Sequence, residues 1–281
     1  MKLNNKHIDL RSPRVMTIVN VTPDSFYDGS RTFTEEEIER HVERAIEQGT
    51  DMLDVGGYSS RPNADEVSVE EEIARVGRAM RVIRRVCPEM VVSIDTFRAE
   101  VVRRTVAEWG DCIVNDISAG ELDPQMITTV AELGLPYVAM HMRGTPATMQ
   151  SMTDYDDIVE EVHQYFAQRL DTLRKAGVKD VVIDPGFGFA KTLEQNYQLM
   201  NGLGRLSDLG APILVGISRK SMIYNLLGCT PAEALNGTTA LHLEALRQGA
   251  KILRVHDTRE AVEVVKIYNQ LNKNSKNNDR V

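Results

Sequence analysis

Polar or ionisable residues end nearly every one of eight short apolar runs in this 281-residue sequence. Each run is rich in Val, Ile and Leu and is about as long as a strand, and helix-length amphipathic stretches separate the runs. In a parallel barrel the carboxyl ends of such strands converge on one face, where their side chains can line a pocket. The residues at these ends are Asn20, Asp54, Asp95, Asn115, His141, Asp184, Ser218 and His256.

The segment after the sixth run joins a carboxylate to glycines and aromatic rings. Asp184 can accept two hydrogen bonds from the edge of a 2-amino-pyrimidinone, and Phe187 and Phe189 offer contacts for a flat ring. The alternative is a structural aspartate beside core phenylalanines, and the segment alone does not decide between the two. Asp95 and Asn115 favour the first interpretation, because they would flank the same pocket. With Asp184 they form a donor and acceptor set for a pterin-like edge.

A second group of side chains is cationic, in a chain whose formal net charge is −8. Local positive charge in a negative protein indicates an anionic substrate group, and arginine forks pair well with phosphate oxygens. Taken singly, each of these residues is more often a solvated surface charge, so the interpretation depends on their shared position at strand ends. The cations are Arg61, Arg219, Lys220, Arg254 and His256, and nearby hydroxyl groups come from Ser60, Ser218 and Ser221.

The first strand leads into the segment 20–26, NVTPDSF, which has no nucleotide-binding glycine pattern. Neither GxGxxG after a strand nor GxxxxGKS occurs in the chain, so we expect side chains and a divalent ion to hold phosphate. Asn20 offers a hard carbonyl oxygen, and Mg²⁺ commonly takes few protein ligands while keeping waters and phosphate oxygens. The alternative is a Pro-Asp turn closed by Ser25.

Composition narrows the class of protein. The 42% apolar and 26% charged residues are ordinary for a globular protein, and no apolar run approaches the roughly 20 residues that span a bilayer. The negative charge argues against nucleic-acid and anionic membrane partners. The N-terminus lacks a signal-peptide core, so we expect a cytoplasmic protein. Three widely spaced cysteines favour neither a disulfide framework nor a zinc knuckle.

The periodicity predicts an α/β fold, a single (β/α)8 TIM barrel over residues 1–270, with 271–281 as a disordered tail. Thr34 before three glutamates predicts a helix start, and Gly134 a helix end. Long loops at 20–33 and 56–67 are candidate lids. Strands are predicted at 15–20, 51–55, 91–95, 111–115, 136–141, 180–184, 212–217 and 252–255. Helices are predicted at 34–48, 68–86, 98–108, 123–133, 154–176, 191–203, 231–248 and 258–270.

At these residues the sequence closely resembles the dihydropteroate synthase family, in order from about residue 14 to residue 270. NVTPDSF, DPGFGF and SRKS are each fairly specific, and their joint occurrence at strand ends strengthens the resemblance. The matching segments are NVTPDSF (20–26), SSRP (59–62), SIDT (93–96), NDIS (115–118), MHMRGTPATMQ (140–150), IDPGFGF (183–189), GISRKS (216–221) and RVHD (254–257).

The resemblance implies a transferase of folate biosynthesis that joins 6-hydroxymethyl-7,8-dihydropterin pyrophosphate to 4-aminobenzoate, giving 7,8-dihydropteroate and pyrophosphate. Mg²⁺ would be the cofactor, sulfonamides would compete with the aminobenzoate, and a homodimer would form through the last helices. A dissociative substitution is the favoured mechanism, because loss of pyrophosphate leaves a delocalised pterin cation that the closed site must stabilise and shield from water. The aryl amine is already a competent nucleophile, so no general base is assigned.

The family pattern also implies residue roles. Asp95, Asn115, Asp184 and Lys220 would bind the pterin, and Asp95, Asp184 and Lys220 would be catalytic. Pyrophosphate would bind to Asn20, Arg61, Arg254 and His256, with Asn20 as a Mg²⁺ ligand. The aminobenzoate would lie among Ser60, Pro62, Phe187, Phe189, Lys220 and Ser221, with its carboxylate near the helix that Ser221 opens.

The chain departs from the family pattern in the second long loop. The family commonly has Glu, Thr and Gly where this chain has Tyr58, Ser60 and Asn63. Ser60 keeps a hydroxyl group, but Tyr58 loses a charge and Asn63 restricts the backbone. These changes bear on the shape of the loop and its aminobenzoate contacts.

Two alternative functions fit parts of the pattern. A pterin- or methyltetrahydrofolate-binding module serving a corrinoid partner would need the pterin carboxylates but no pyrophosphate cluster, and the joint presence of NVTPDSF, SRKS and RVHD argues against it. A degenerate barrel kept as a scaffold would have lost charged residues from these three motifs, and none is lost there.

Overall fold

The strands form one parallel sheet that curls into a barrel. The structure is a computed structural model that describes residues 1–3, 6–22, 34–59 and 67–278. Within these residues the order in the sheet is β8-β7-β6-β5-β4-β3-β10-β9, and a parallel bridge between Ile183 and Ile213 links the two ends. The strands are β3 (Arg14–Asn20), β4 (Met52–Gly56), β5 (Val91–Asp95), β6 (Ile113–Asp116), β7 (Tyr137–Met140), β8 (Val181–Asp184), β9 (Leu214–Val215) and β10 (Ile252–Val255).

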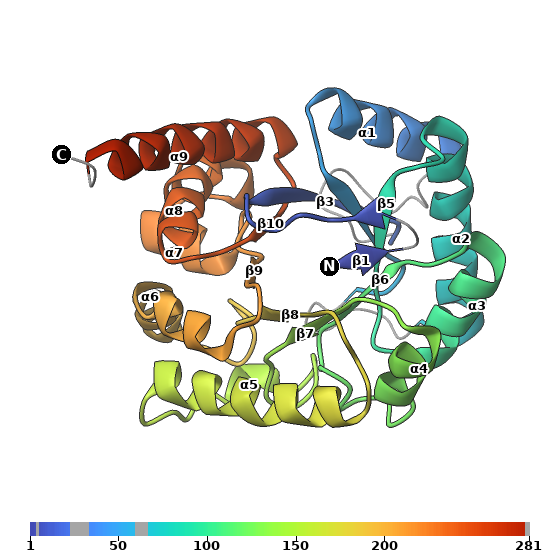
Figure 1. The fold of residues 1–281 in the computed structure, drawn as a ribbon, viewed down its shortest axis with the longest axis horizontal. Coiled ribbons are helices and arrows are strands. Elements are labelled where there is room, and N and C mark those ends of the chain that lie inside the picture. Colours follow the sequence, from blue (N-terminus) through green and yellow to red (C-terminus); the bar gives the residue numbers. More distant parts are fainter. Residues whose placement is uncertain (4–5, 23–33, 60–66, 279–281) are drawn as a thin grey trace.

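Helices surround the strands on the outside (Figure 1). Thr34 caps the first of them, and its side chain accepts from the Glu37 amide while Glu37 bonds back to the Thr34 amide, which confirms the predicted helix start. Gly134 ends the fourth in a left-handed conformation, as predicted. The helices are α1 (Glu35–Glu47), α2 (Val69–Val86), α3 (Ala99–Trp109), α4 (Met126–Leu133), α5 (Ile158–Lys175), α6 (Leu193–Asn201), α7 (Ser221–Leu227), α8 (Leu235–Arg247) and α9 (Thr258–Asn278).

Apolar side chains fill the space between the strands and the helices. One buried cluster packs β4 to β7 against α1 to α4, and a second packs β8 to β10 against α5 to α9. Because both faces of these strands are buried, the strands read as nearly continuous apolar runs. None of the described helices is long and apolar enough to cross a membrane.

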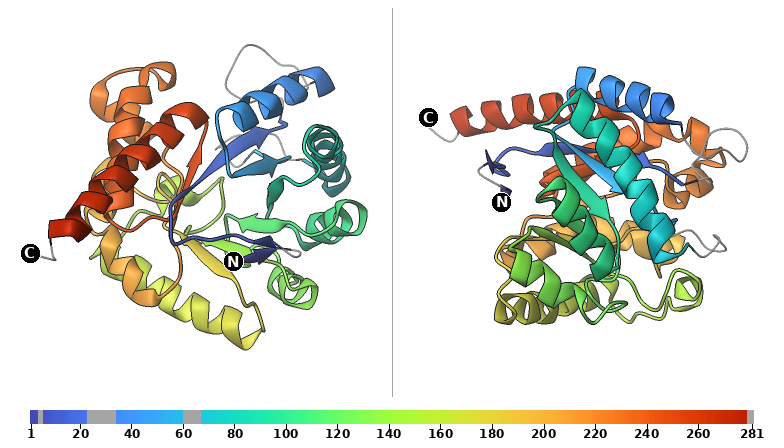
Figure 2. Two further views of the ribbon diagram at one scale, coloured as in Figure 1. Left: turned by 45° about the horizontal axis from the view of Figure 1, so that its top comes forward. Right: turned by 90° about the vertical axis from the view of Figure 1, so that its right-hand side faces the viewer.

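A short hairpin covers the amino end of the barrel. Strands β1 (Lys2–Leu3) and β2 (Lys6–His7) pair antiparallel, and Leu3 packs on an apolar layer formed by the first residues of several barrel strands. Figure 2 shows this hairpin at one end of the molecule, beside the start of β3. The polar strand ends therefore line the opposite end.

The predicted barrel is confirmed, and its details differ in three places. The hairpin at residues 2–7 was not predicted, because two-residue strands carry no periodicity. Helix α7 begins at Ser221, as the family pattern implies, although the periodicity placed it within a connection, since seven residues are too few for a periodic pattern. Helix α9 extends to Asn278, eight residues beyond its predicted end at 270, so the polar stretch expected as a tail begins as helix.

Candidate active site

Strand register places the predicted polar residues in one row at the carboxyl end of the barrel. Asn20 of β3 lies beside Gly56 of β4, Gly56 beside Asp95 of β5, and Asp95 beside Asn115 of β6. A Cβ atom at Gly56 would lie 3.1 Å from the Asn20 Oδ1 atom and 3.8 Å from the Asp95 Oδ2 atom. Glycine at this position thus leaves room for an amide oxygen and a carboxylate on either side.

Arg254 ties this row together from β10. Its Nε atom donates to Asp54 Oδ2 at 2.6 Å, and its Nη2 atom donates to Asp95 Oδ2 at 2.5 Å. The Asn115 amide also donates to both Asp54 oxygens, at 3.2 and 3.3 Å. Asp54 is fully buried, and removing one partner of such a buried pair costs about 3–5 kcal/mol. Asp54, which was expected only as a strand-end residue, therefore holds Arg254 and Asn115 directly and Asp95 through Arg254.

The turn after β8 presents Asp184 from the opposite side of the barrel. Its Oδ1 atom accepts from the Gly186 amide at 2.8 Å, and its Oδ2 atom lies 3.9 Å from where a Gly216 Cβ atom would be. Gly186 has φ of +68°, and a Cβ atom there would stand 2.0 Å from the His141 carbonyl oxygen. Only glycine permits this turn, so the first glycine of DPGFGF aims the carboxylate.

Lys220 precedes α7 and lies against the same turn. Its Nζ atom donates to the Phe187 carbonyl at 2.5 Å and stands 4.7 Å from the centre of the Phe189 ring. Phe189 is half-buried and packs on the cluster containing Ile117 and Met140. Lys220 and Phe189 thus come together with Asp184, as predicted from the sequence.

Phe187 departs from its predicted role. The residue is fully buried and its side chain belongs to the core cluster under α5 to α9, so the ring presents no accessible face for an aminobenzoate. Alternation of side chains around the two glycines sends one phenylalanine inward and the other to the pocket. The main chain of Phe187 still contributes, through its carbonyl bond to Lys220.

The residues of the predicted cationic group differ in their surroundings: Arg219 is paired within the fold, whereas His256 lies at the mouth of the barrel. Arg219 forms a two-pronged pair with Asp257, at 2.8 Å for both contacts, and also donates to the carbonyls of Pro231 and Ala232. These partners hold the guanidinium between the segment before α8 and the residue that precedes α9, so Arg219 is better described as a structural residue than as an anion ligand. His256 lies at the mouth beyond β10, and its amide donates to Ser218 Oγ at 3.2 Å.

Burial shifts the ionisation of the site. It raises the pKa of Asp95 to about 7, although Arg254 opposes the shift, and it raises the pKa of Asp184, with Lys220 opposing. Burial lowers the pKa of Lys220 to about 8, with Asp184 opposing, and lowers the pKa of His256 to about 4 with help from Arg254. Carboxylates with raised pKa values beside cations are typical of binding and catalytic sites.

Tyr58, the first departure from the family pattern, contacts the residues after β5. Its ring meets Phe97 edge to face at 5.1 Å, and the Arg98 guanidinium stands 5.2 Å from its centre. Arg98 in turn pairs with buried Glu72 at 2.8 Å. Tyr58, which stands where the family commonly has a glutamate, thus packs against Phe97 and against Arg98, whose charge is balanced by Glu72.

Ser60, Arg61, Pro62 and Asn63 lie outside the described residues, as do 23–33 of the first long loop. Ser221 is half-buried as the first residue of α7, next to Lys220. Within the described part of the chain no three His, Cys, Asp or Glu side chains gather as a metal cluster. An Mg²⁺ ion bound mainly by substrate oxygens does not need such a cluster, and the Asn20 oxygen suits it.

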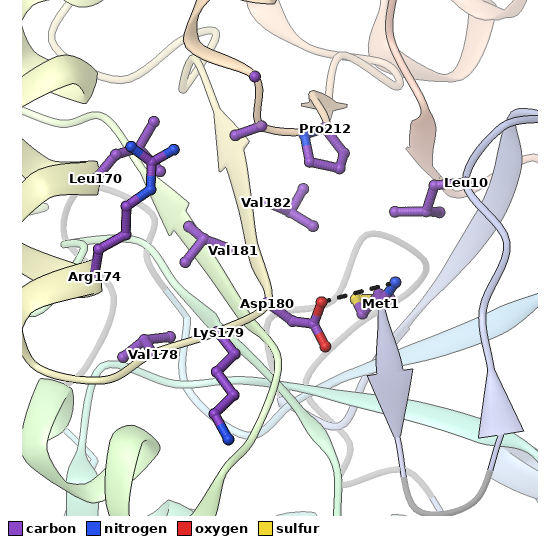
Figure 3. A pocket seen from close by; sticks show the side chains of 12 residues that line it. Met1, Leu10, Leu170, Arg174, Val178, Lys179, Asp180, Val181, Val182 and Pro212 are labelled. Atoms are coloured by element: carbon purple, nitrogen blue, oxygen red, sulfur yellow. Dashed lines mark ion pairs between the residues drawn. The ribbon is translucent and has the colours of Figure 1, made fainter.

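A cavity lies at the amino end of the barrel (Figure 3). It measures about 220 Å³ and is lined mainly by aliphatic side chains, among them Leu10, Leu170 and Val182. Its acidic group, Asp180, lies 3.8 Å from the Met1 amino group. The buried carboxylates and the perturbed lysine are at the other end, and the chemistry is therefore assigned there.

Comparison with known proteins agrees with this assignment. The family described as pterin binding enzyme matches residues 16–256. Dihydropteroate synthase of Escherichia coli K12 is 43% identical over 262 residues, covering 92% of each chain, and that of Haemophilus influenzae is 40% identical, covering 95% of this chain and 98% of the relative.

Solved structures agree as well. Yersinia pestis dihydropteroate synthase in a sulfonamide complex has a TM-score of 0.90 at 36% identity, covering 97% of this chain and 98% of that one. The Xanthomonas albilineans enzyme with 4-aminobenzoic acid has a TM-score of 0.84 at 42% identity, covering 94% of each. With these matches along nearly its whole length, the chain belongs to the dihydropteroate synthases, transferases of the pterin-binding enzyme family.

Proposed function

We propose that this protein condenses 6-hydroxymethyl-7,8-dihydropterin pyrophosphate with 4-aminobenzoate to form 7,8-dihydropteroate and pyrophosphate. The observation that carries the proposal is the convergence of Asp95, Asn115 and Asp184 with Lys220 and Arg254 at one end of the barrel. Related proteins support it, since the Xanthomonas albilineans enzyme has been solved with 4-aminobenzoic acid and with 7,8-dihydropteroate.

The pterin binds between the two sides of the barrel mouth. Asp184 accepts from the amino-pyrimidinone edge, and Asp95 and Asn115 engage the opposite edge. Lys220 donates to the pterin from beside the Phe187 carbonyl. Each buried polar group then has a partner, which is what a site needs in order to reject a ring that lacks these donors and acceptors.

The aminobenzoate lies against the Phe189 ring, with Lys220 and Ser221 close to it. Phe189 gives its aromatic ring a face to pack on, and Ser221 supplies a hydroxyl group for the carboxylate. Following the family pattern, Ser60 and Pro62 of the second long loop also contact the aminobenzoate. A sulfonamide that imitates the aminobenzoate would compete for the same surface.

Pyrophosphate leaves near the end of β3 and β10. Asn20, Arg61, Arg254 and His256 hold it, and Mg²⁺ bound with Asn20 would neutralise its charge. The carbon–oxygen bond breaks first and its electron pair leaves with the pyrophosphate. The aryl nitrogen then forms the new bond to the CH₂ carbon and loses a proton. Asp95 and Asp184 stabilise the intervening pterin cation.

Turnover tests the proposal directly. Pyrophosphate release with Mg²⁺ should be coupled to dihydropteroate formation when 4-aminobenzoate is present. A dissociative path also predicts that oxygen label in the bridging position of the substrate scrambles when 4-aminobenzoate is absent. Tight pterin binding without turnover would favour the corrinoid-serving binding module, and turnover without scrambling would favour direct displacement.

We further propose that the enzyme acts as a cytoplasmic homodimer joined through α7 and α9. Leu226 and Leu227 of α7 and Ile267 of α9 are more than half exposed, and the two helices lie in one group with α8 (Figure 1). An apolar surface of this kind is typical of an interface. Sedimentation should give twice the chain mass, and Leu227→Glu should yield a monomer; a wild-type monomer would contradict this assembly.

A further inference from the structure

The turn 185–190 holds the aromatic wall of the site in an unusual backbone conformation. Gly186, Gly188 and Ala190 all have positive φ, at 68°, 82° and 50°. The alanine is the costly member, because a left-handed conformation costs a residue with a side chain about 1–2 kcal/mol. Such a turn directs carbonyl groups away from regular secondary structure, and buried carbonyls need donors.

Two lysine ammonium groups supply donors from opposite sides. Lys220 donates to the Phe187 carbonyl from the pocket side. Lys191 is only 5% exposed, and its Nζ atom donates to the carbonyls of Gly186 and Phe189, both at 2.9 Å. Its third contact is His141 Nδ1 at 3.1 Å. Burial lowers the pKa of Lys191 to about 7, with Asp184 opposing the shift. In the ammonium form each of its three protons has an acceptor, as a buried charge requires.

His141 joins this turn to a second segment of the site. Burial and the nearby Lys191 charge lower the pKa of His141 well below its usual range, so the neutral ring can accept at Nδ1. The ring is fixed edge to face against Tyr165 at 4.8 Å. His141 begins the segment HMRGTPATMQ after β7, to which the proposed chemistry gives no role. Lys191 thus links the ends of β7 and β8 beneath the pocket.

We propose that Lys191 is a positioning residue, whose ammonium locks the turn 185–190 so that the Phe189 ring is preset for the aminobenzoate. The inference rests on the proposed function for the identity of the ligand. Presetting the ring lowers the entropy lost on binding, and a displacement of about 1 Å in a binding wall can cost up to about 100-fold in rate. Asp95 and Asn115 are held outside this turn, by Arg254 and Asp54. Asp184 accepts from the Gly186 amide at the start of the turn, whereas Phe189 lies between the contacts of both lysines, so Lys191 should affect the aminobenzoate more than the pterin.

Lys191→Met tests this role in two measurements. In the free protein we expect hydrogen exchange of the Gly188 and Phe189 amides to speed up at least about tenfold, because their turn loses its central donor. In the enzyme we expect the KM for 4-aminobenzoate to rise about tenfold, with kcat and pterin binding changed less than about threefold. Lys175→Met is the matched control, because Lys175 is exposed on α5 and pairs with Asp171 one turn away.

A double-mutant cycle with Phe189→Leu separates positioning from general stability. If Lys191 acts through the ring, the two changes in KM are not additive. Lys191→Gln, which keeps two donors without the charge, should fall between wild type and Lys191→Met, and carries the test if Lys191→Met does not fold.

Unchanged exchange of the turn amides, additive changes in KM, or an equal loss of pterin binding would each overturn the proposal. Exchange is measured without substrates, so its outcome is separate from the proposed function. Faster exchange in Lys191→Met together with a wild type that forms no dihydropteroate would support the lock and refute the proposed reaction.

Discussion

The two ends of the barrel are built from the same strands and differ in what they bury. At the carboxyl end, Asp54, Asp95 and Asp184 are buried or nearly so, with Lys220 and Arg254 as their countercharges. At the amino end, Leu3 covers an apolar layer that includes Met16. The comparison shows that stability and chemistry are separated along each strand. Side chains at the amino end close the apolar core, whereas the carboxyl end buries charged groups that bind a ligand and lower stability.

Asp184→Asn should have the largest effect, and it should lower activity without lowering stability. Losing a charged acceptor for the pterin should lower kcat/KM about 100- to 1,000-fold. The fold raises the pKa of Asp184, so it disfavours the carboxylate at neutral pH and a neutral amide should leave the melting temperature unchanged or higher. Steady-state kinetics and thermal unfolding check both. A large fall in the melting temperature would mean that this carboxylate serves the fold.

Gly186→Ala and Gly210→Ala compare the cost of a Cβ atom at the carboxyl and amino ends of the barrel. The new Cβ atom would overlap the His141 carbonyl oxygen at φ of +68°, so we expect a loss of about 3 kcal/mol in the free energy of unfolding. Gly210→Ala, beside the amino-end cavity at φ of +69°, meets open space and should cost only about 1 kcal/mol. Urea denaturation measures both. Equal losses would show that the close approach at Gly186 is not needed.

The pH dependence of kcat/KM should be bell-shaped. Below pH about 7 the carboxyl of Asp95 becomes protonated and cannot accept, and the rate constant should fall about tenfold per pH unit. Above pH about 8 the Lys220 ammonium loses its proton and the rate constant should fall again. Asp95→Asn should remove the acid limb along with most of the activity. A wild-type profile that stays flat across both values would contradict the electrostatic description.

Leu3→Ala should have the smallest effect on catalysis. The change removes a buried side chain from the apolar layer at the amino end and should cost about 2 kcal/mol in the free energy of unfolding. Activity should stay within about twofold of wild type. A loss of activity beyond the loss of stability, measured by kinetics beside urea denaturation, would show that the two ends are coupled.

The sequence predicted the barrel and the strand-end residues because both depend on local pattern. A buried strand is recognised in sequence as an apolar run, and the runs that end near Asp95, Asn115 and Asp184 are strands that end there in the structure. The inward turn of Phe187 could not be predicted, because both phenylalanines in DPGFGF have the same local pattern. Nor could the pairing of Arg219 with Asp257, since 38 residues separate them.

Asp54 and Lys191 show a second limit. Asp54 ends an apolar run, yet only the packing of β10 beside β3 reveals that it holds Arg254, 200 residues away. The sequence pattern placed Lys191 at the start of a helix. Its role depends on the positive φ angles of the preceding turn, and of the residues there only the glycines indicate such angles. Contacts between distant segments therefore decide which polar residues serve a ligand and which serve each other.

The most direct test of the separation between the two ends uses two aspartates on one strand. Asp180 precedes β8 at the amino end and Asp184 ends it at the carboxyl end. Binding of the dihydropterin pyrophosphate, measured by calorimetry, should weaken about 100-fold in Asp184→Asn and stay within about twofold of wild type in Asp180→Asn. Equal affinity in the two variants, or a greater loss in Asp180→Asn, would contradict the placement of the pterin site.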